Sequence, residues 1–134
     1  MPKADRIKAI APEIAEIRRD FHRHPELLFD VHRTAGIVAE KLKSYGVDEI
    51  VTGLGRTGVV GVIKGRANGS GKVIGLRADM DALPIHEETN LPHRSSVEGK
   101  MHACGHDGHT AMLLGAAKYL SETRDFDGTA IVIF

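Results

Sequence analysis

The chain has 134 residues, of which 42% are hydrophobic and 27% charged, which suits one soluble domain with a core and excludes a disordered tail. Eighteen basic residues balance eighteen acidic ones, so no net charge favours nucleic acid or an anionic membrane, and no apolar stretch has the length of a membrane span. The single cysteine cannot form an internal disulfide and no apolar signal core follows the start, so we expect a cytoplasmic protein.

Two helices are predicted in the first third of the chain. Five apolar side chains share one helical face: Ile7, Ile10, Ile14, Ile17 and Phe21. Pro12 predicts that the regular helix starts there, because proline is tolerated in a first turn, and Pro25 predicts an end near residue 24. A second helix is predicted over residues 33–45, with Gly46 as its left-handed stop.

The remaining elements alternate between strands and one helix. Short apolar runs predict strands over residues 49–51, 58–63 and 73–76, with a surface turn over 67–71. A helix is predicted over 109–122, with Asp107 as its cap, and a last strand over 129–134. This order predicts a helix-flanked, mixed α/β sheet. Because a strand this apolar normally continues into further structure, we expect the chain to be a fragment.

Residues 102–109 form the most informative segment, because they contain the only cysteine, three of the eight histidines and an aspartate. Thiolate, imidazole and carboxylate groups bind first-row transition metals. Cys104 and His106 are the best candidate ligands, since Gly105 between them lets both side chains converge on one point. The alternative is an ordinary turn into a helix whose histidines are only solvated.

Side chains that could support a metal site lie in this segment and in an earlier one. Asp107 and His109 could orient a ligand imidazole, and His102 could be a ligand or a supporting residue. A predicted strand ends just before Asp79 and Asp81, and strand alternation places both on the same side. One of them could hold a ligand histidine while the other makes a structural hydrogen bond. The simpler interpretation is an Asx turn.

Two further polar groups are expected at the surface. His22 and His24 close the first predicted helix, where positive charge is favoured. His86, Glu87 and Glu88 are expected to form a solvated loop or the rim of a cleft. Spacing alone therefore assigns neither group to a site.

Three separated segments carry a resemblance to a known family: RDFHRHPEL at 19–27, RADMDALP at 77–84 and MHACGHDGHTA at 101–111. Together, and in this order, they resemble the hippurate hydrolase branch of the metal-dependent amidohydrolases. That branch includes N-acyl-amino-acid amidohydrolases and auxin-conjugate hydrolases, and it is related to aminoacylase and zinc carboxypeptidases. The resemblance implies a three-layer α/β/α metallopeptidase-like catalytic domain, of which residues 1–134 are the N-terminal part. A smaller dimerisation or lid domain interrupts this domain in full-length members.

The resemblance also implies roles for particular residues. Cys104 and His106 would be ligands of a centre with two divalent ions (Mn, Zn, Ni or Co), and Asp81 would support the active site. The family's other ligands, a glutamate and two histidines, follow a strand like that at 130–134, as does the general-base glutamate. None of these lies within the 134 residues, so we expect the chain by itself to be inactive.

The expected activity of the full-length protein is hydrolysis of the amide bond of N-acyl amino acids such as hippurate. Its expected partner is that small substrate, with no nucleic acid and no membrane, and the full-length protein could be a homo-oligomer. Two other function classes remain open. One is a non-catalytic metal-binding or dimerising module, and the other is a cysteine hydrolase that uses Cys104 as nucleophile.

Overall fold

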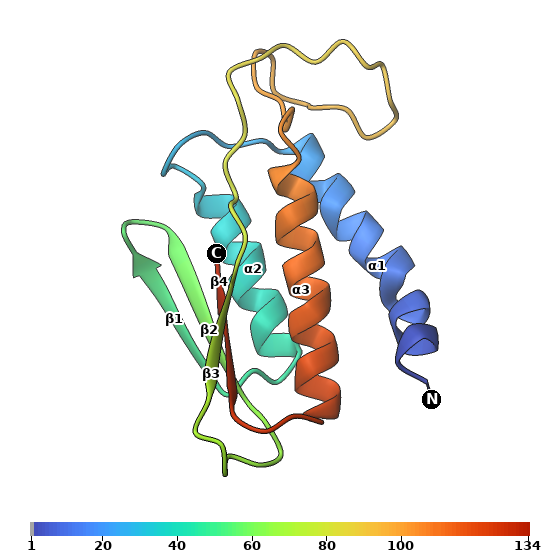
Figure 1. The fold of residues 1–134 in the computed structure, drawn as a ribbon. Coiled ribbons are helices and arrows are strands. Elements are labelled where there is room, and N and C mark those ends of the chain that lie inside the picture. Colours follow the sequence, from blue (N-terminus) through green and yellow to red (C-terminus); the bar gives the residue numbers. More distant parts are fainter. Residues whose placement is uncertain (1) are drawn as a thin grey trace.

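The computed structural model describes residues 2–134, which fold into a four-stranded sheet with helices packed against it (Figure 1). The elements in chain order are α1 (Lys3–Arg23), α2 (His32–Ser44), β1 (Glu49–Leu54), β2 (Gly58–Lys64), β3 (Val73–Arg77), α3 (His106–Thr123) and β4 (Thr129–Ile133). Every predicted helix and strand is present, and the mixed α/β class is confirmed. None of the helices in residues 2–134 is both long and apolar enough to cross a membrane.

The start of α1 differs from the prediction. The helix begins at Lys3, and Pro12 lies inside it rather than in its first turn. A proline in a helix removes one backbone hydrogen bond. Contacts with α3 offset that loss, because Ile10 is buried and Arg6 donates two hydrogen bonds to the Glu122 carboxylate. The helix therefore continues through the proline because its first turns are held by their neighbour.

The sheet has the strand order β1-β2-β4-β3. The pairs β1–β2 and β2–β4 are antiparallel, whereas β3 and β4 are parallel, with Leu76 opposite Val132. A parallel pair needs a long crossover, and residues 78–128 with α3 supply it. The carboxyl ends of β3 and β4 consequently lie at the same edge of the sheet, where loops of α/β proteins carry their functional groups.

The core lies between the sheet and the helices. Both α2 and α3 contact β2, and α1 packs on α3 (Figure 1). The fully buried side chains that fill this space come from all three helices and from two strands: Phe21, Val38, Leu42, Ile63, Leu114 and Val132. These contacts fix α3 relative to the ends of β3 and β4, and so they set the frame for the polar residues at that edge.

Two glycines, one directly after β2 and one within α2, test the packing of the fold. A Cβ on Gly65 would lie 2.3 Å from the carbonyl oxygen of Phe126, so we expect Gly65→Ala to lower the free energy of unfolding by about 3 kcal/mol. Gly36 is exposed within α2 and has open space around its Cα. Gly36→Ala should therefore raise the free energy of unfolding by about 0.5–1 kcal/mol. Urea denaturation of both variants checks the pair, and equal effects would contradict this account.

Candidate metal centre

The candidate centre lies where the chain leaving β3 meets the first turn of α3. The helix begins at His106, earlier than the predicted residue 109, because Gly105 adopts a left-handed conformation with φ of 94° and turns the chain directly into the helix. This start aims the side chains of the first turn at the carboxyl end of β3. The segments 77–84 and 102–109 are thereby brought together.

His106 lies between the two aspartates that follow β3. Its Nδ1 is 2.9 Å from Oδ1 of Asp81, and its Nε2 is 3.3 Å from Oδ2 of Asp79. The expectation that both carboxylates face one site agrees with this geometry. If the Nδ1–H donates to Asp81, the lone pair of Nε2 points toward Asp79. A carboxylate that accepts the Nδ1 proton in this way orients the ring and leaves Nε2 available to bind a metal.

His109 completes the group from the same face of the helix, three residues after His106. Its Nδ1 lies 2.8 Å from Oδ1 of Asp79, and its ring stacks on that of His106 with centroids 5.5 Å apart. Thr110 adds a hydrogen bond of 2.7 Å from its hydroxyl to the backbone oxygen of Asp79. Burial raises the pKa of Asp79, but the hydrogen bond from His109 and the charges of the two imidazoles outweigh it. The pKa of Asp79 therefore lies below its usual value.

These side chains fit a divalent metal ion. One ligand atom each from Asp79, His106 and His109 lies within 4.8 Å of the others, and two imidazoles with a carboxylate are a ligand set that zinc and manganese accept. Asp79 and His109, expected only as supporting residues, are thus close enough to bind the ion directly. Cys104 is exposed on the loop before the helix and lies outside this group of three, so its role as a ligand stays a prediction.

His102 is the unusual member of the segment. The side chain is buried, and neither ring nitrogen has a hydrogen-bond partner among residues 2–134. Burial lowers its pKa, and the positive charges of His22 and His106 add to this effect. A buried imidazole normally has a partner, so His102 can still bind a water molecule or a ligand at the edge of the centre.

Asp107 does not have the place that the sequence predicted. No side chain caps α3, and Asp107 is fully buried with its Oδ2 directed at α1. That oxygen lies 2.8 Å from Nδ1 of His22 and 3.0 Å from Nε of Arg18. The predicted cap is therefore wrong: Gly105 occupies the cap position, and Asp107 lies inside the first turn, where one carboxylate oxygen accepts the N–H of Gly108 and the other contacts α1.

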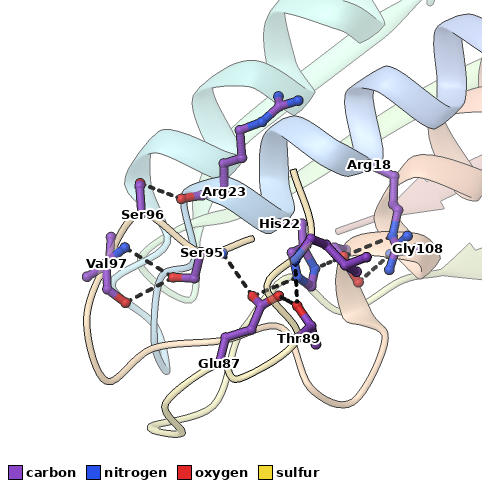
Figure 2. A network of polar contacts seen from close by, with 11 residues as sticks. Arg18, His22, Arg23, Glu87, Thr89, Ser95, Ser96, Val97 and Gly108 are labelled. Atoms are coloured by element: carbon purple, nitrogen blue, oxygen red, sulfur yellow. Dashed lines mark hydrogen bonds and ion pairs between the residues drawn. The ribbon is translucent and has the colours of Figure 1, made fainter. Parts of the chain in front are cut away.

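The expectation that His22 and Glu87 lie at the surface is also wrong. Both are buried, and Nε2 of His22 lies 2.9 Å from Oε1 of Glu87 (Figure 2). Glu87 also accepts a hydrogen bond from the backbone N–H of Ser95 at 2.8 Å and one from the hydroxyl of Thr89. Burial raises the pKa of Glu87, but the hydrogen bonds from Thr89, Ser95 and His22 bring it below its usual value.

The other residues of these two groups behave as expected. His86 and Glu88 are exposed, and His24 is half-buried with its Nδ1 2.9 Å from the backbone oxygen of Asp20. One sequence signal could have identified the buried network, because Arg18 and His22 are four residues apart and share a helical face. A polar stripe on a helix more often faces solvent, so this signal alone favours a surface position.

A cavity of about 280 Å³ opens beside the two aspartates. Its apolar lining comes from three places in the fold and includes Phe29, Leu54 and Phe134. The side chains that could bind a metal ion thus lie beside a recess with both polar and apolar walls, as is common in small-molecule sites.

Comparison with known proteins places this geometry in context. Residues 75–134 match Peptidase family M20/M25/M40. The hippurate hydrolase of Campylobacter jejuni is 54% identical over 122 residues, which are 91% of this chain and 31% of the relative. An N-acyl-L-amino acid amidohydrolase of Geobacillus stearothermophilus is 45% identical over 119 residues, covering 89% of this chain and 31% of that protein.

A solved structure agrees with these relatives. The Bacillus subtilis YXEP protein, described as a dinuclear metal-binding peptidase of the M20 family, superimposes with a TM-score of 0.88 at 46% identity. The match covers 95% of this chain and 35% of that one. The chain therefore spans about a third of the length of the proteins that it matches.

The buried Glu87 should make stability depend on pH in the acid range. Its pKa in the folded chain is lowered, so its ionised form contributes to stability. This contribution is fully present above about pH 4.3, the pKa of an unfolded glutamate, and it is lost as the pH falls through the pKa of the folded chain. We expect Glu87→Gln to cost stability at pH 7 and progressively less as the pH falls. Urea denaturation at several pH values measures this difference.

The matched control for this measurement is Glu88→Gln, which makes the same change at the exposed neighbouring residue. Its effect on the free energy of unfolding should be small at every pH. A Glu87→Gln variant whose stability difference from the parent chain does not change with pH would contradict the assignment of an ionised, buried Glu87.

Proposed function

The chain is a member of the M20/M25/M40 peptidase family, and we propose that the whole protein hydrolyses the amide bond of N-acyl amino acids at a centre of two divalent metal ions. The observation that carries the proposal is the placement of His106 between Asp81 and Asp79, with His109 on the same carboxylate. Relatives named hippurate hydrolase and N-acyl-L-amino acid amidohydrolase support the substrate class.

Within this chain, each donor has a separate part in holding the metal. Asp81 accepts the proton of the His106 Nδ1 and so leaves the other ring nitrogen available as a ligand. Asp79 and His109 bring a carboxylate and a second imidazole to the same point. Cys104 supplies a thiolate from the adjoining loop, in keeping with the family resemblance. Nitrogen, oxygen and sulfur donors together suit Zn, Mn, Ni or Co.

Divalent ions bound here supply Lewis acidity that polarises an amide carbonyl and lowers the pKa of bound water. The contribution of the chain is to fix the donors and to bind the substrate beside them. The recess next to Asp79 and Asp81 has apolar walls that include Phe29 and Phe134, and it can take a hydrophobic acyl group such as benzoyl. The base that removes a proton from water is the glutamate that the resemblance places after a strand like β4.

A cysteine hydrolase is the weaker alternative. A cysteine nucleophile needs a base within hydrogen-bond reach, whereas both ring nitrogens of His106 face aspartates and Nδ1 of His109 also faces Asp79. The thiol of Cys104 is exposed. The imidazoles of His106 and His109 are thus engaged with carboxylates, as in a metal centre.

Metal affinity separates the two interpretations. If Cys104 and His106 are ligands, Cys104→Ala and His106→Ala should each abolish tight Zn²⁺ binding, and Asp81→Asn should weaken it about 10- to 100-fold because the imidazole loses its orienting acceptor. Isothermal titration calorimetry on the chain measures these changes, with Asp125→Asn at an exposed site as the control. Unchanged binding by Cys104→Ala would favour the cysteine as a nucleophile.

Catalysis should require more than these 134 residues. We expect the whole protein to release benzoate from hippurate in the presence of Mn²⁺, and a polypeptide of residues 1–134 to release none, because the resemblance places the base glutamate and three ligands elsewhere. Chromatographic assay of benzoate checks both. Turnover by the 134-residue polypeptide that persists after purification and disappears with chelator would refute this division of the site.

A further inference from the structure

The first turn of α3 carries the candidate ligands, yet its start has no side-chain cap. The chain enters the helix through Gly105 in a left-handed conformation. One carboxylate oxygen of Asp107 accepts the N–H of Gly108 at 2.9 Å, and the other oxygen faces α1. A helix start without a cap depends on tertiary contacts for its position. The contacts made by this turn therefore decide where its side chains point.

Two neighbouring residues of the turn are held by different parts of the fold. His106 is directed at the carboxyl end of β3, and Asp107 is directed at α1. Successive residues of a helix differ by about 100° in direction, so a rotation of the turn that displaces one side chain also displaces the other. A contact that fixes Asp107 consequently fixes the direction in which His106 is presented.

His22 makes that contact through both of its ring nitrogens. Nδ1 lies 2.8 Å from Asp107 and Nε2 lies 2.9 Å from Glu87. Both contacts are within hydrogen-bond distance, so one ring joins two carboxylates that come from different segments of the chain. Arg18 adds a contact of 3.0 Å from its Nε to Oδ2 of Asp107. Two side chains of α1 therefore hold the carboxylate of the first turn, in a cluster that also includes Glu87.

Glu87 extends the cluster into the segment over residues 84–101, which leads to the loop with Cys104. That segment is attached to the end of α1, because the backbone N–H and the hydroxyl of Ser96 both donate to the backbone oxygen of Arg23 (Figure 2). Leu83, just before this segment, pairs with Met101 at its end through backbone hydrogen bonds of 2.9 and 3.0 Å. The cluster thus contacts the chain on both sides of the loop that carries Cys104, at Glu87 before it and at Asp107 after it.

We propose that His22 is a positioning residue of the metal centre, which acts by joining Asp107 on the first turn of α3 to Glu87 on the segment that leads to Cys104. This inference rests on the metal centre proposed above and adds a residue that touches neither the metal nor the substrate. His22 acts on the centre through its two hydrogen bonds, and the geometry of the centre therefore depends on the end of α1.

The test uses Co²⁺ as a probe, because its visible absorption reports coordination geometry as well as binding. In the chain with His22→Gln we expect Co²⁺ affinity to fall about tenfold, at the low end for a residue behind a ligand, and the absorption bands to shift. Glu87→Gln keeps the shape of the side chain but weakens one hydrogen bond, so a smaller change in the same direction is expected. Titrations are made at a temperature where each chain is folded.

Two control variants separate positioning from general stability. His24→Gln makes the same replacement two residues away, where Nδ1 of the imidazole lies 2.9 Å from the backbone oxygen of Asp20 on α1. Leu42→Ala removes fully buried packing from α2 and so destabilises the fold without touching the cluster. Both should bind Co²⁺ with the affinity and spectrum of the parent chain.

Amide hydrogen exchange without metal provides the second readout. Exchange at Gly108 should accelerate in His22→Gln more than in either control, because its N–H is bonded to the carboxylate that His22 holds. Parent-like Co²⁺ affinity and spectrum in His22→Gln would overturn the proposal, as would an equal loss in Leu42→Ala. If His22→Gln does not fold, the same comparison with Glu87→Gln decides.

A parent chain that takes up no Co²⁺ would refute the metal centre itself rather than the positioning. In that case the metal-free exchange decides about His22, since it reports the order of the first turn directly. Unchanged exchange at Gly108 in His22→Gln would then overturn the positioning proposal, and a selective acceleration would support it.

Discussion

The structure depends on how the first turn of α3 is held. This turn begins without a side-chain cap, after a glycine in a left-handed conformation, and two sets of imidazole–carboxylate contacts hold it in place. One set joins His106 and His109 to the aspartates after β3, and the other joins Asp107 to His22 on α1. Because the helix also spans the core, these contacts transmit the packing of α1 and the sheet to the candidate ligands.

The two sets differ in their exposure and therefore in what they can do. The side chains of Asp79 and Asp81 are 23% and 38% exposed, whereas those of Asp107 and Glu87 are 0% and 3% exposed. The exposed carboxylates can exchange an imidazole proton for a metal ion, because solvent and ligands reach them. The oxygens of the buried carboxylates are all hydrogen-bonded within the fold, so these carboxylates serve the architecture.

In the metal centre that we propose, these contacts have a chemical purpose. Metal-dependent hydrolysis needs ligands whose orientation is fixed before the ion arrives. In this chain that orientation comes from Asp81 at one nitrogen of His106 and from the turn of helix on which the imidazole stands. The neighbouring recess, bordered by Asp79 and Phe29, places a space of about 280 Å³ beside the same residues.

The sequence by itself determined the elements and the identity of the chemical groups. The pattern of apolar residues predicted every helix and strand, although not every boundary, since it reflects which face is buried. The segment 102–109 predicted a metal site through its rare combination of donors. Only the tertiary structure decided the partners. Pro12 could remain inside α1 because α3 supports it, and His22 is buried because Asp107 and Glu87, far away in sequence, meet both of its nitrogens. A polar side chain looks like a surface residue until the fold supplies its counter-charges, and spacing along the chain carries no record of them.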